Sequence, residues 1–408
     1  RTIFARFSSG PNGFHGAIKT DEGMVYIDPY SAGDIHNYMV YYTNDHIDES
    51  LKDKTICGTD DSFQQHETGK AKWGTRRLGD KMELRKYRLA LACTGEWGAV
   101  RGTVEKALAD MVAFVERANI VFETELGLTV VLIAKNDELI FMDGATDPYT
   151  NSNQGLSLVG QNTSVLNVRI GSGSYEIGHA FSICNDVGGV AAGNICTQGK
   201  GAGITCHNSP SISNGIVLVF NHEVGHQMTA AHTFNNCPGQ EGQLSQSGYE
   251  PGGGSTIMAY PNACGTSNLG VSRDDYYHVI SLDQMLSFTN SEGADAYDCA
   301  EKIDINNFLP VITMPYKDGF SIPKSTPFFL KASAEDENGD IMKYNWDQFD
   351  NQTSSPLGAP VGNAPIFRSL KPTTNPARYF PNVSRILNGQ FTDKTELLPT
   401  YGRELTFR

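Results

Sequence analysis

One stretch of eleven residues decides how the rest of the chain is organised: His222-Glu223-Val224-Gly225-His226-Gln227-Met228-Thr229-Ala230-Ala231-His232. On a helix, His222 and His226 lie one turn apart, so both side chains leave the same face. Two imidazoles in that arrangement can bind one metal ion, and Glu223 projects beside them. The spacing therefore predicts a metal site on a helix.

The third histidine constrains the backbone. On a continuing helix, His232 would lie about 15 Å from His222 along the axis, at about 1.5 Å per residue. We therefore expect the helix to end near 228–231 and the chain to turn back. Three histidines with one position left for water are typical of catalytic zinc, with Glu223 taking a proton from the bound water. The alternative is an amphipathic helix whose histidines are hydrogen-bonded in a core.

Composition narrows the class of protein. The 408 residues are long enough for two or three domains, and hydrophobic residues make up 39%. A net charge of −14 argues against a nucleic acid partner. We find no apolar run of transmembrane length and no signal peptide, and we expect a secreted monomer that binds protein or peptide substrates. The chain begins in the middle of a pattern, at Arg1-Thr2-Ile3, which indicates a processed or trimmed piece.

The cysteines indicate disulfides rather than a second zinc site. None of the eight forms a C-x-x-C pair, and their wide spacing suits an oxidising compartment. We expect Cys237 and Cys264 to pair across the long loop that follows His232. Cys93 and Cys299 lie near the two ends of the candidate catalytic domain and could join them. The pairing of the remaining cysteines stays open: Cys57, Cys184, Cys196 and Cys206.

Residues 1–85 predict a small β-rich pro-segment. Strand patterns occupy Phe14–Lys19, Met24–Asp28 and Tyr38–Tyr42, with Gly, Asn and Asp turns between them. Basic residues then crowd 70–88, which is typical of a solvated linker open to proteolysis. We interpret that run as the join between the pro-segment and the enzyme.

Residues 86–305 predict an α/β domain with a mixed, mostly parallel sheet. Apolar residues at helical spacing over Val104–Asn119 lie between strand patterns, and a helix between strands favours parallel pairing. Gly178–Ile183 could be an edge strand that pairs with an extended peptide. The strand and helix patterns expected in this block are Tyr87–Cys93, Leu128–Ala134, Leu139–Met142, a metal-site helix from near 213–216, and a capping box at Ser281-Leu282-Asp283-Gln284 that opens a helix to about Phe288.

Residues 306–408 predict an all-β sandwich. Short strands are expected at Leu309–Ile312, Phe328–Ala334 and Ile341–Trp346. The acidic turn Asp336–Asp340 joins two of them and offers oxygen ligands for calcium, although plain turn chemistry also explains it. The last residues, Glu404–Arg408, have a strand pattern, so we expect the sandwich to be truncated.

With these motifs in place, the chain resembles the metzincin zinc endopeptidases, and most closely the bacterial secreted reprolysin-like (M12B-like) group. Ser255-Thr256-Ile257-Met258 looks like the Met-turn beneath the zinc in that clan. The resemblance also covers segments at 89–96, 147–151 and 177–182, and 322–328 looks like the immunoglobulin-like domain that often follows such enzymes. One position departs: the family usually has Gly where this chain has Thr229, and a β-branched residue at positive φ costs about 1–2 kcal/mol.

The resemblance implies a role for each site residue. His222, His226 and His232 would bind Zn²⁺, Glu223 would be general base and then acid, and Met258 would support the site from below. Tyr260 would approach the zinc or stabilise the oxyanion; a core or surface tyrosine is the alternative. Cys57 could place a thiolate on the zinc as a latency switch, with a disulfide or a buried thiol as alternatives.

Together these features predict a secreted zinc-dependent endopeptidase, present here as a zymogen whose pro-segment covers the active site. The alternative is a latent or vestigial zinc-site protein that acts as a binding or adhesion module.

Overall fold

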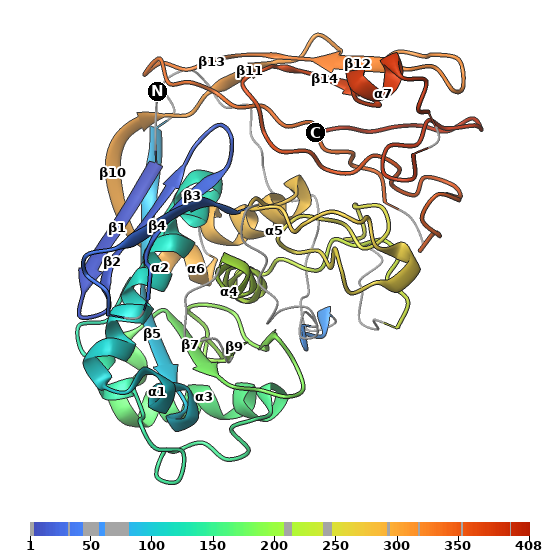
Figure 1. Cartoon of the computed structure of the whole chain (residues 1–408). Helices are drawn as coiled ribbons and strands as arrows, with labels where there is room; N and C mark the ends of the chain where they lie inside the picture. Colours follow the sequence, from blue (N-terminus) through green and yellow to red (C-terminus); the bar gives the residue numbers. More distant parts are fainter. Residues whose placement is uncertain are drawn as a thin grey trace.

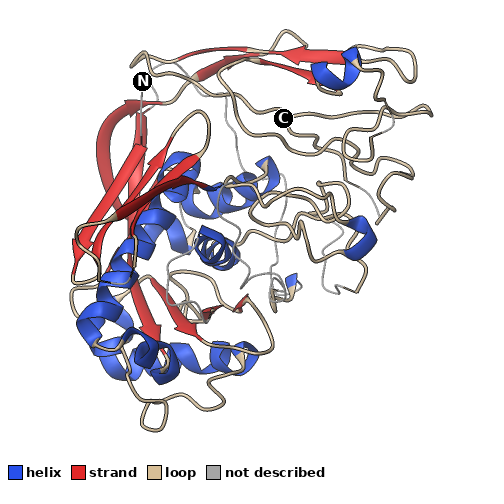
Figure 2. Ribbon diagram, in the orientation of Figure 1, coloured by secondary structure: helices blue, strands red, loops and turns tan. Residues whose placement is uncertain are grey.

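The computed structural model describes most of the chain, and the ranges are 4–31, 33–43, 57–61, 81–207, 214–239, 247–291, 294–316, 319–351, 354–391 and 393–408. A sheet flanked by helices forms the centre, a second sheet lies at the N-terminal side, and a loop-rich region follows (Figures 1 and 2). Among the described helices, none is long and apolar enough to cross a membrane.

The central sheet is mixed and mostly parallel, as predicted. Its strands run in the order β10 (Glu301–Phe308), β5 (Lys81–Cys93), β7 (Ile177–Ser182), β9 (Gly203–Cys206) and β8 (Gly189–Ala191), and β6 (Leu128–Leu132) also pairs with β5. β6 and β7 are parallel to β5, and β9 is parallel to β7. β10 is antiparallel to β5, and β8 is antiparallel to β9. The edge beside the candidate site is therefore β8. The prediction that Gly178–Ile183 is an edge strand is wrong, because β7 is paired on both sides.

Alternation along β5 explains why helices cover both faces of this sheet. Leu89 and Leu91 are fully buried in a cluster with α2 (Val104–Leu126) and α4 (Asn214–Gln227). Ala90 and Ala92 point the other way, into a smaller cluster with α3 (Gly155–Ile170). Successive side chains of a strand face opposite sides, so a continuous apolar run fits a strand buried on both. The other described helices of this part are α1 (Gly95–Arg101), α5 (Val279–Asn290), α6 (Asp295–Cys299), η4 (Asn136–Leu139), η5 (Ser172–Ser174) and η6 (Gly265–Ser267).

Two local predictions in this domain are wrong. Leu139–Met142 forms no strand; the chain makes the 3-10 turn η4 and then one isolated bridge between Ile140 and Cys93. The capping box at 281–284 does not start α5, because the helix begins at Val279, where His278 is the N-cap and accepts from the Ile280 N–H. The His278 Nδ1 accepts the backbone hydrogen bond that a Ser or Asp side-chain oxygen usually accepts at an N-cap.

The N-terminal sheet lies against α2, visible at the left of Figure 1. It is an antiparallel meander of β1 (Phe4–Gly10), β2 (Gly13–Lys19), β3 (Met24–Pro29) and β4 (Tyr38–Tyr42). Its three sequence-predicted strands are confirmed, and β1 was missed. Met24 and Tyr26 bury against Ile120 of α2, and Arg117 of the same helix forms an ion pair with Asp28.

The basic run does not behave as one linker. Residues 70–80 lie outside the described residues, and 81–88 are the first part of strand β5, where Lys86 pairs with Glu301 at 2.6 Å. For 81–88 the linker prediction is wrong, because the backbone pairs with β10 and β6. The predicted domain boundaries at 85 and 305 both lie inside paired strands, β5 and β10.

The C-terminal region contains little regular structure. β11 (Val311–Thr313) pairs with β13 (Ser333–Glu335), and β12 (Phe328–Lys331) pairs with β14 (Ala377–Phe380). One short helix, α7 (Val383–Leu387), follows β14. Of the strand expected at Ile341–Trp346, only an isolated bridge at Tyr344 is present. Packing around Trp346, Phe367 and Phe380 gives this region its own core, and the immunoglobulin-like sandwich stays a prediction.

Three disulfides cross-link the central domain: Cys184–Cys206, Cys196–Cys299 and Cys237–Cys264. The Cys237–Cys264 pair is confirmed. The predicted pairing of Cys93 with Cys299 is wrong: Cys93 is a free, fully buried thiol inside β5, and Cys299 instead bonds Cys196.

Candidate metal and catalytic site

Helix α4 carries the first half of the site. His222, Glu223 and His226 all lie on it and are at most 2% exposed, and the helix ends at Gln227. The prediction that the helix ends near 228–231 is therefore confirmed to within one residue. After Gln227 the Ala230 N–H bonds back to the Gly225 carbonyl at 2.9 Å, which closes the last turn.

Thr229 makes the turn that brings His232 to the other two histidines. Its φ is 82°, in the left-handed region that β-branched residues rarely adopt. The strain expected from the sequence is therefore present. Surrounding contacts hold it: Thr229 is 2% exposed, and its hydroxyl donates to the Gln284 carbonyl at 3.4 Å. Gln284 also accepts from the Ala231 N–H at 3.0 Å, which fixes the exit of the turn.

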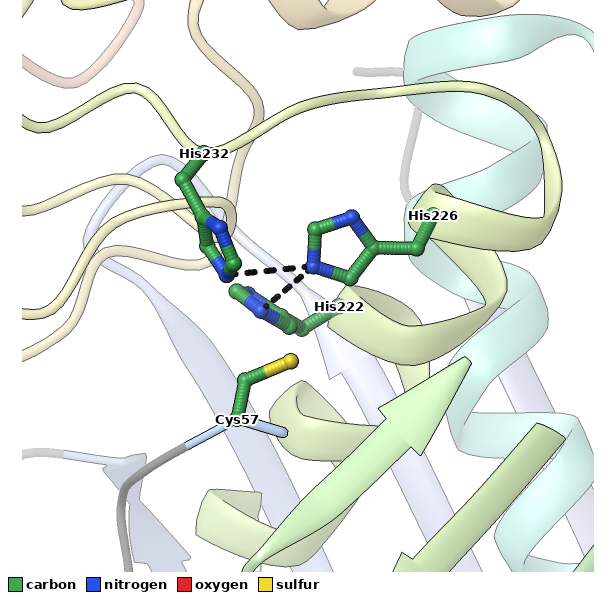
Figure 3. Close-up of side chains that lie close together, drawn as sticks. All are labelled: Cys57, His222, His226 and His232. Carbon is green, nitrogen blue, oxygen red and sulfur yellow. Dashed lines mark hydrogen bonds between the residues drawn. The ribbon is translucent and has the colours of Figure 1, made fainter. Parts of the chain in front are cut away.

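Three imidazole nitrogens converge on one point. The Nε2 of His226 lies 3.1 Å from that of His222 and 3.2 Å from that of His232, and dashed lines in Figure 3 join these atoms. Each Nδ1 already has an oxygen partner: the Ile257 carbonyl for His222, the Ala230 carbonyl for His226 and the Asp61 carboxylate for His232. Each Nδ1 thus carries the hydrogen, and the three Nε2 lone pairs face one another.

This arrangement fits a zinc ion. Lone pairs that point at one another repel unless a cation lies between them. Tetrahedral zinc with Zn–N bonds of about 2.0–2.1 Å separates two nitrogen ligands by about 3.3–3.4 Å, close to the spacing seen here. Burial also lowers the pKa of His222 and of His226, to about 3 for His226, so both rings are neutral as metal ligands must be.

The Met-turn lies beneath these ligands. Met258 is fully buried, and the neighbouring Ile257 carbonyl orients His222 at 2.7 Å. A Cβ on Gly225 would come within 2.7 Å of the Met258 sulfur, so a larger residue between the two α4 histidines would require the methionine side chain to move. The sulfur therefore supports the backbone of the helix.

Glu223 lies beside the histidines in a buried pocket against strand β8. It is fully buried, and a Cβ on Gly189 would overlap its carboxylate. Burial raises its pKa to about 8, opposed by hydrogen bonds from Cys57 and Thr59. Its Oε1 has no hydrogen-bond partner among the described residues. A buried carboxylate oxygen without a partner is costly, and a water or substrate group at the site would satisfy it.

A short N-terminal segment, Cys57–Asp61, lies across the site. Ligand atoms of Cys57 and the three histidines all lie within 4.8 Å of one another, and Figure 3 shows the sulfur facing the imidazoles. The segment follows edge strand β8: Cys57 bridges Gly189 in parallel, and the Gly58 N–H donates to the Gly189 carbonyl at 2.8 Å. The edge that an extended peptide would need is therefore covered.

The Cys57–Asp61 segment also contacts Glu223 and His232 directly. The Cys57 thiol lies 3.4 Å from Glu223 Oε2, and the Thr59 hydroxyl donates to that oxygen at 3.3 Å. Thr59 also accepts from the Ala191 N–H at 2.9 Å. Asp61 is fully buried and accepts from the Nδ1–H and backbone N–H of His232.

The structure brings Tyr260 into the site. Its hydroxyl donates to His232 Nε2 at 2.7 Å and lies 3.4 Å from the Cys57 carbonyl. The side chain is 2% exposed, and burial raises the pKa of the phenol well above 10. A neutral phenol beside the three Nε2 atoms can donate a hydrogen bond within the site.

Sequence reasoning missed Thr59 and Asp61. The signal available was local: both are polar and lie within four residues of Cys57. Nothing in their spacing relates them to His232, which lies 171 residues beyond Asp61.

The calcium hypothesis gains no support. In the acidic turn, Asp336 accepts from the Asp340 N–H at 3.0 Å, which is ordinary turn chemistry. Among the described residues, the cluster of His, Cys, Asp and Glu able to hold a metal is the one formed by Cys57 and the three histidines.

Comparison with known proteins agrees with this geometry. Residues 84–287, half of the chain, match the family model described as "Metallo-peptidase family M12B Reprolysin-like". No curated protein matches the chain. One similar solved structure is titled "Structure of a chaperone-substrate complex"; it is 11% identical with a TM-score of 0.29, and the alignment covers 66% of this chain and 38% of that one. The chain therefore spans well under half the length of that structure.

Proposed function

Because the chain belongs to the reprolysin-like metallopeptidases of family M12B, we propose that it is a secreted zinc endopeptidase held latent by its own N-terminal segment. The observation that carries the proposal is the convergence of three Nε2 lone pairs beside a buried glutamate. That combination serves hydrolysis, because a cation and a proton acceptor act on the same water.

Each residue has a definite part in the proposed reaction. Zinc bound by His222, His226 and His232 would polarise the scissile carbonyl and make the attacking water more acidic. Glu223 accepts the proton of that water and passes it to the leaving amine. Its Oε1, which has no hydrogen-bond partner among the described residues, is available to accept that proton.

Tyr260 would stabilise the oxyanion that forms on the scissile carbonyl. Its hydroxyl lies at the site and is held 2.7 Å from the third histidine. Preorganised donors of this kind stabilise developing charge without rearrangement during the reaction. Peptide substrate would lie extended along β8, where Gly189 leaves room for the Glu223 carboxylate.

Latency follows from the Cys57–Asp61 segment. Cys57 would supply a thiolate as the fourth zinc ligand, Thr59 holds the general base, and the segment backbone covers β8. On this proposal the residues before β5 are a pro-segment, and cleavage in the part of the basic run that precedes β5 would let the segment leave. Three disulfides support a secreted enzyme, because disulfides persist mainly in oxidising compartments.

The test is metal content and proteolysis measured on one purified full-length sample. Casein or gelatin hydrolysis is followed before and after limited trypsin treatment, with Glu223→Gln as the matched inactive control. One zinc per chain, with activity that appears only after cleavage, supports a latent endopeptidase.

Full activity without cleavage would show that the chain is an enzyme but that the uncut form is not a zymogen. Zinc without activity in either state would favour the competing hypothesis, an adhesion or binding module with a vestigial site.

A further inference from the structure

Asp61 is the carboxylate that contacts the candidate zinc ligand His232. Its Oδ2 accepts from the Nδ1–H of His232 at 3.0 Å and from the backbone N–H of the same residue at 3.2 Å. Its Oδ1 lies 3.9 Å from the Nδ1 of His226. The side chain is fully buried, and the ion-pair partners seen for it in the described chain are these two histidines.

The three candidate ligands differ in what orients them. His222 and His226 donate to main-chain carbonyls, at Ile257 and Ala230, and all of these residues lie within the span that matches the family model. His232 instead depends on a charged side chain from outside that span. A carboxylate that accepts from a ligating imidazole fixes its tautomer and makes the metal-binding nitrogen more basic.

Charge balance explains why a fully buried carboxylate is tolerated here. An ionised carboxylate is costly to bury unless it is paired. No described Lys or Arg forms an ion pair with Asp61. The buried Arg273 lies within electrostatic range of Glu223, Cys57 and Tyr260, and the metal on the three histidines would add a cationic centre next to His232. Asp61 and the zinc therefore each reduce the cost of burying the other, through His232.

We propose that Asp61 is a positioning residue for the zinc site, which holds His232 with Nε2 toward the metal and tightens zinc binding while the Cys57–Asp61 segment is docked. The inference rests on the proposed function only in requiring that zinc binds the three histidines. Coupling of this kind is reciprocal, so zinc also tightens the docking of the segment. Departure of the segment removes a ligand, Cys57, and the support of a second ligand, His232, in one step.

Asp61 and Cys57 share one short segment, so their effects must be separated. If Asp61 acted only by holding Cys57 in place, its replacement would matter only while the thiol is present. If it acts through His232, its effect persists when the thiol is removed. A double-mutant cycle of Asp61→Asn and Cys57→Ser distinguishes these two routes.

The experiment measures zinc dissociation constants of the unprocessed full-length chain by competition with a chromophoric chelator. Asp61→Asn keeps the shape and one acceptor oxygen but removes the charge. Loss of such an outer partner typically weakens metal binding about 10–100-fold, and we expect that range, both alone and in the Cys57→Ser background. Asp60→Asn, at the exposed neighbouring position, is the matched control and should bind zinc as the wild type does.

Thermal unfolding with and without zinc shows whether Asp61→Asn acts merely on folding. We expect the variant to lose less stability without zinc than with it, so that the zinc-dependent rise in Tm is smaller. Equal zinc affinity, an effect lost in Cys57→Ser, or the same loss of stability with and without zinc would each overturn the inference. A wild type that binds no zinc would overturn the proposed function itself.

Discussion

Replacement of Cys57 by alanine should release part of the activity of the uncut chain. Without the thiol, the Cys57–Asp61 segment is held by hydrogen bonds: Gly58 to Gly189, Thr59 to β8 and Glu223, and Asp61 to His232. Neutral bonds contribute about 1 kcal/mol each and bonds to a charged group about 1.5–3 kcal/mol, so the two bonds of each kind together stabilise docking by about 5–8 kcal/mol.

Ordering five residues opposes docking by a similar amount. At about 1–2 kcal/mol for each backbone, the cost is about 5–10 kcal/mol. Hydrogen bonds and ordering therefore nearly cancel, and the bond from the thiolate to the metal decides whether the site is closed. We expect uncut Cys57→Ala to hydrolyse a fluorogenic peptide at least about tenfold faster than the uncut wild type, because a near-zero balance leaves a sizeable open fraction.

The matched control is the other free cysteine. Cys93 is fully buried in β5, away from the metal cluster, so Cys93→Ala should lower stability without changing latency. The account fails if uncut Cys57→Ala is as inactive as the uncut wild type while trypsin-treated wild type is active. That result would mean that other contacts block the site.

Three further substitutions test the site in the processed enzyme. Glu223→Gln should lower kcat by about 10²–10⁴-fold with zinc content unchanged, as loss of a general base does. A kcat equal to that of the wild type would exclude Glu223 as the general base. Tyr260→Phe should lower kcat tenfold or more with little change in KM if the phenol holds the oxyanion, and unchanged kinetics would reject it. Thr229→Gly should unfold in urea with a free energy about 1–2 kcal/mol above that of Thr229→Ala, because only glycine relieves the positive φ; equal values would contradict the strain.

Local spacing was enough to predict the part of the site that lies on one helix and its turn. His222 and His226 are brought together by helical periodicity, and the position of His232 required the chain to turn where Thr229 does turn. The same holds for β5 and α2, whose apolar patterns are long and regular.

What the sequence could not predict depends on contacts between distant segments. Asp61 reaches His232 only because the Cys57–Asp61 segment lies along edge strand β8. No periodicity in the sequence predicts that placement. The choice of Cys196 over Cys93 as the partner of Cys299 is of the same kind, since three-dimensional proximity decides it. The start of α5 was missed for a local reason: His278 caps the helix in place of the expected Ser281.

Zinc K-edge X-ray absorption of the purified, uncut chain tests the central claim most directly. The account predicts one zinc with three nitrogen scatterers at about 2.0–2.1 Å and one sulfur at about 2.3 Å, and loss of the sulfur in Cys57→Ala. A zinc shell without sulfur in the wild type, or a chain that retains no zinc, would contradict it.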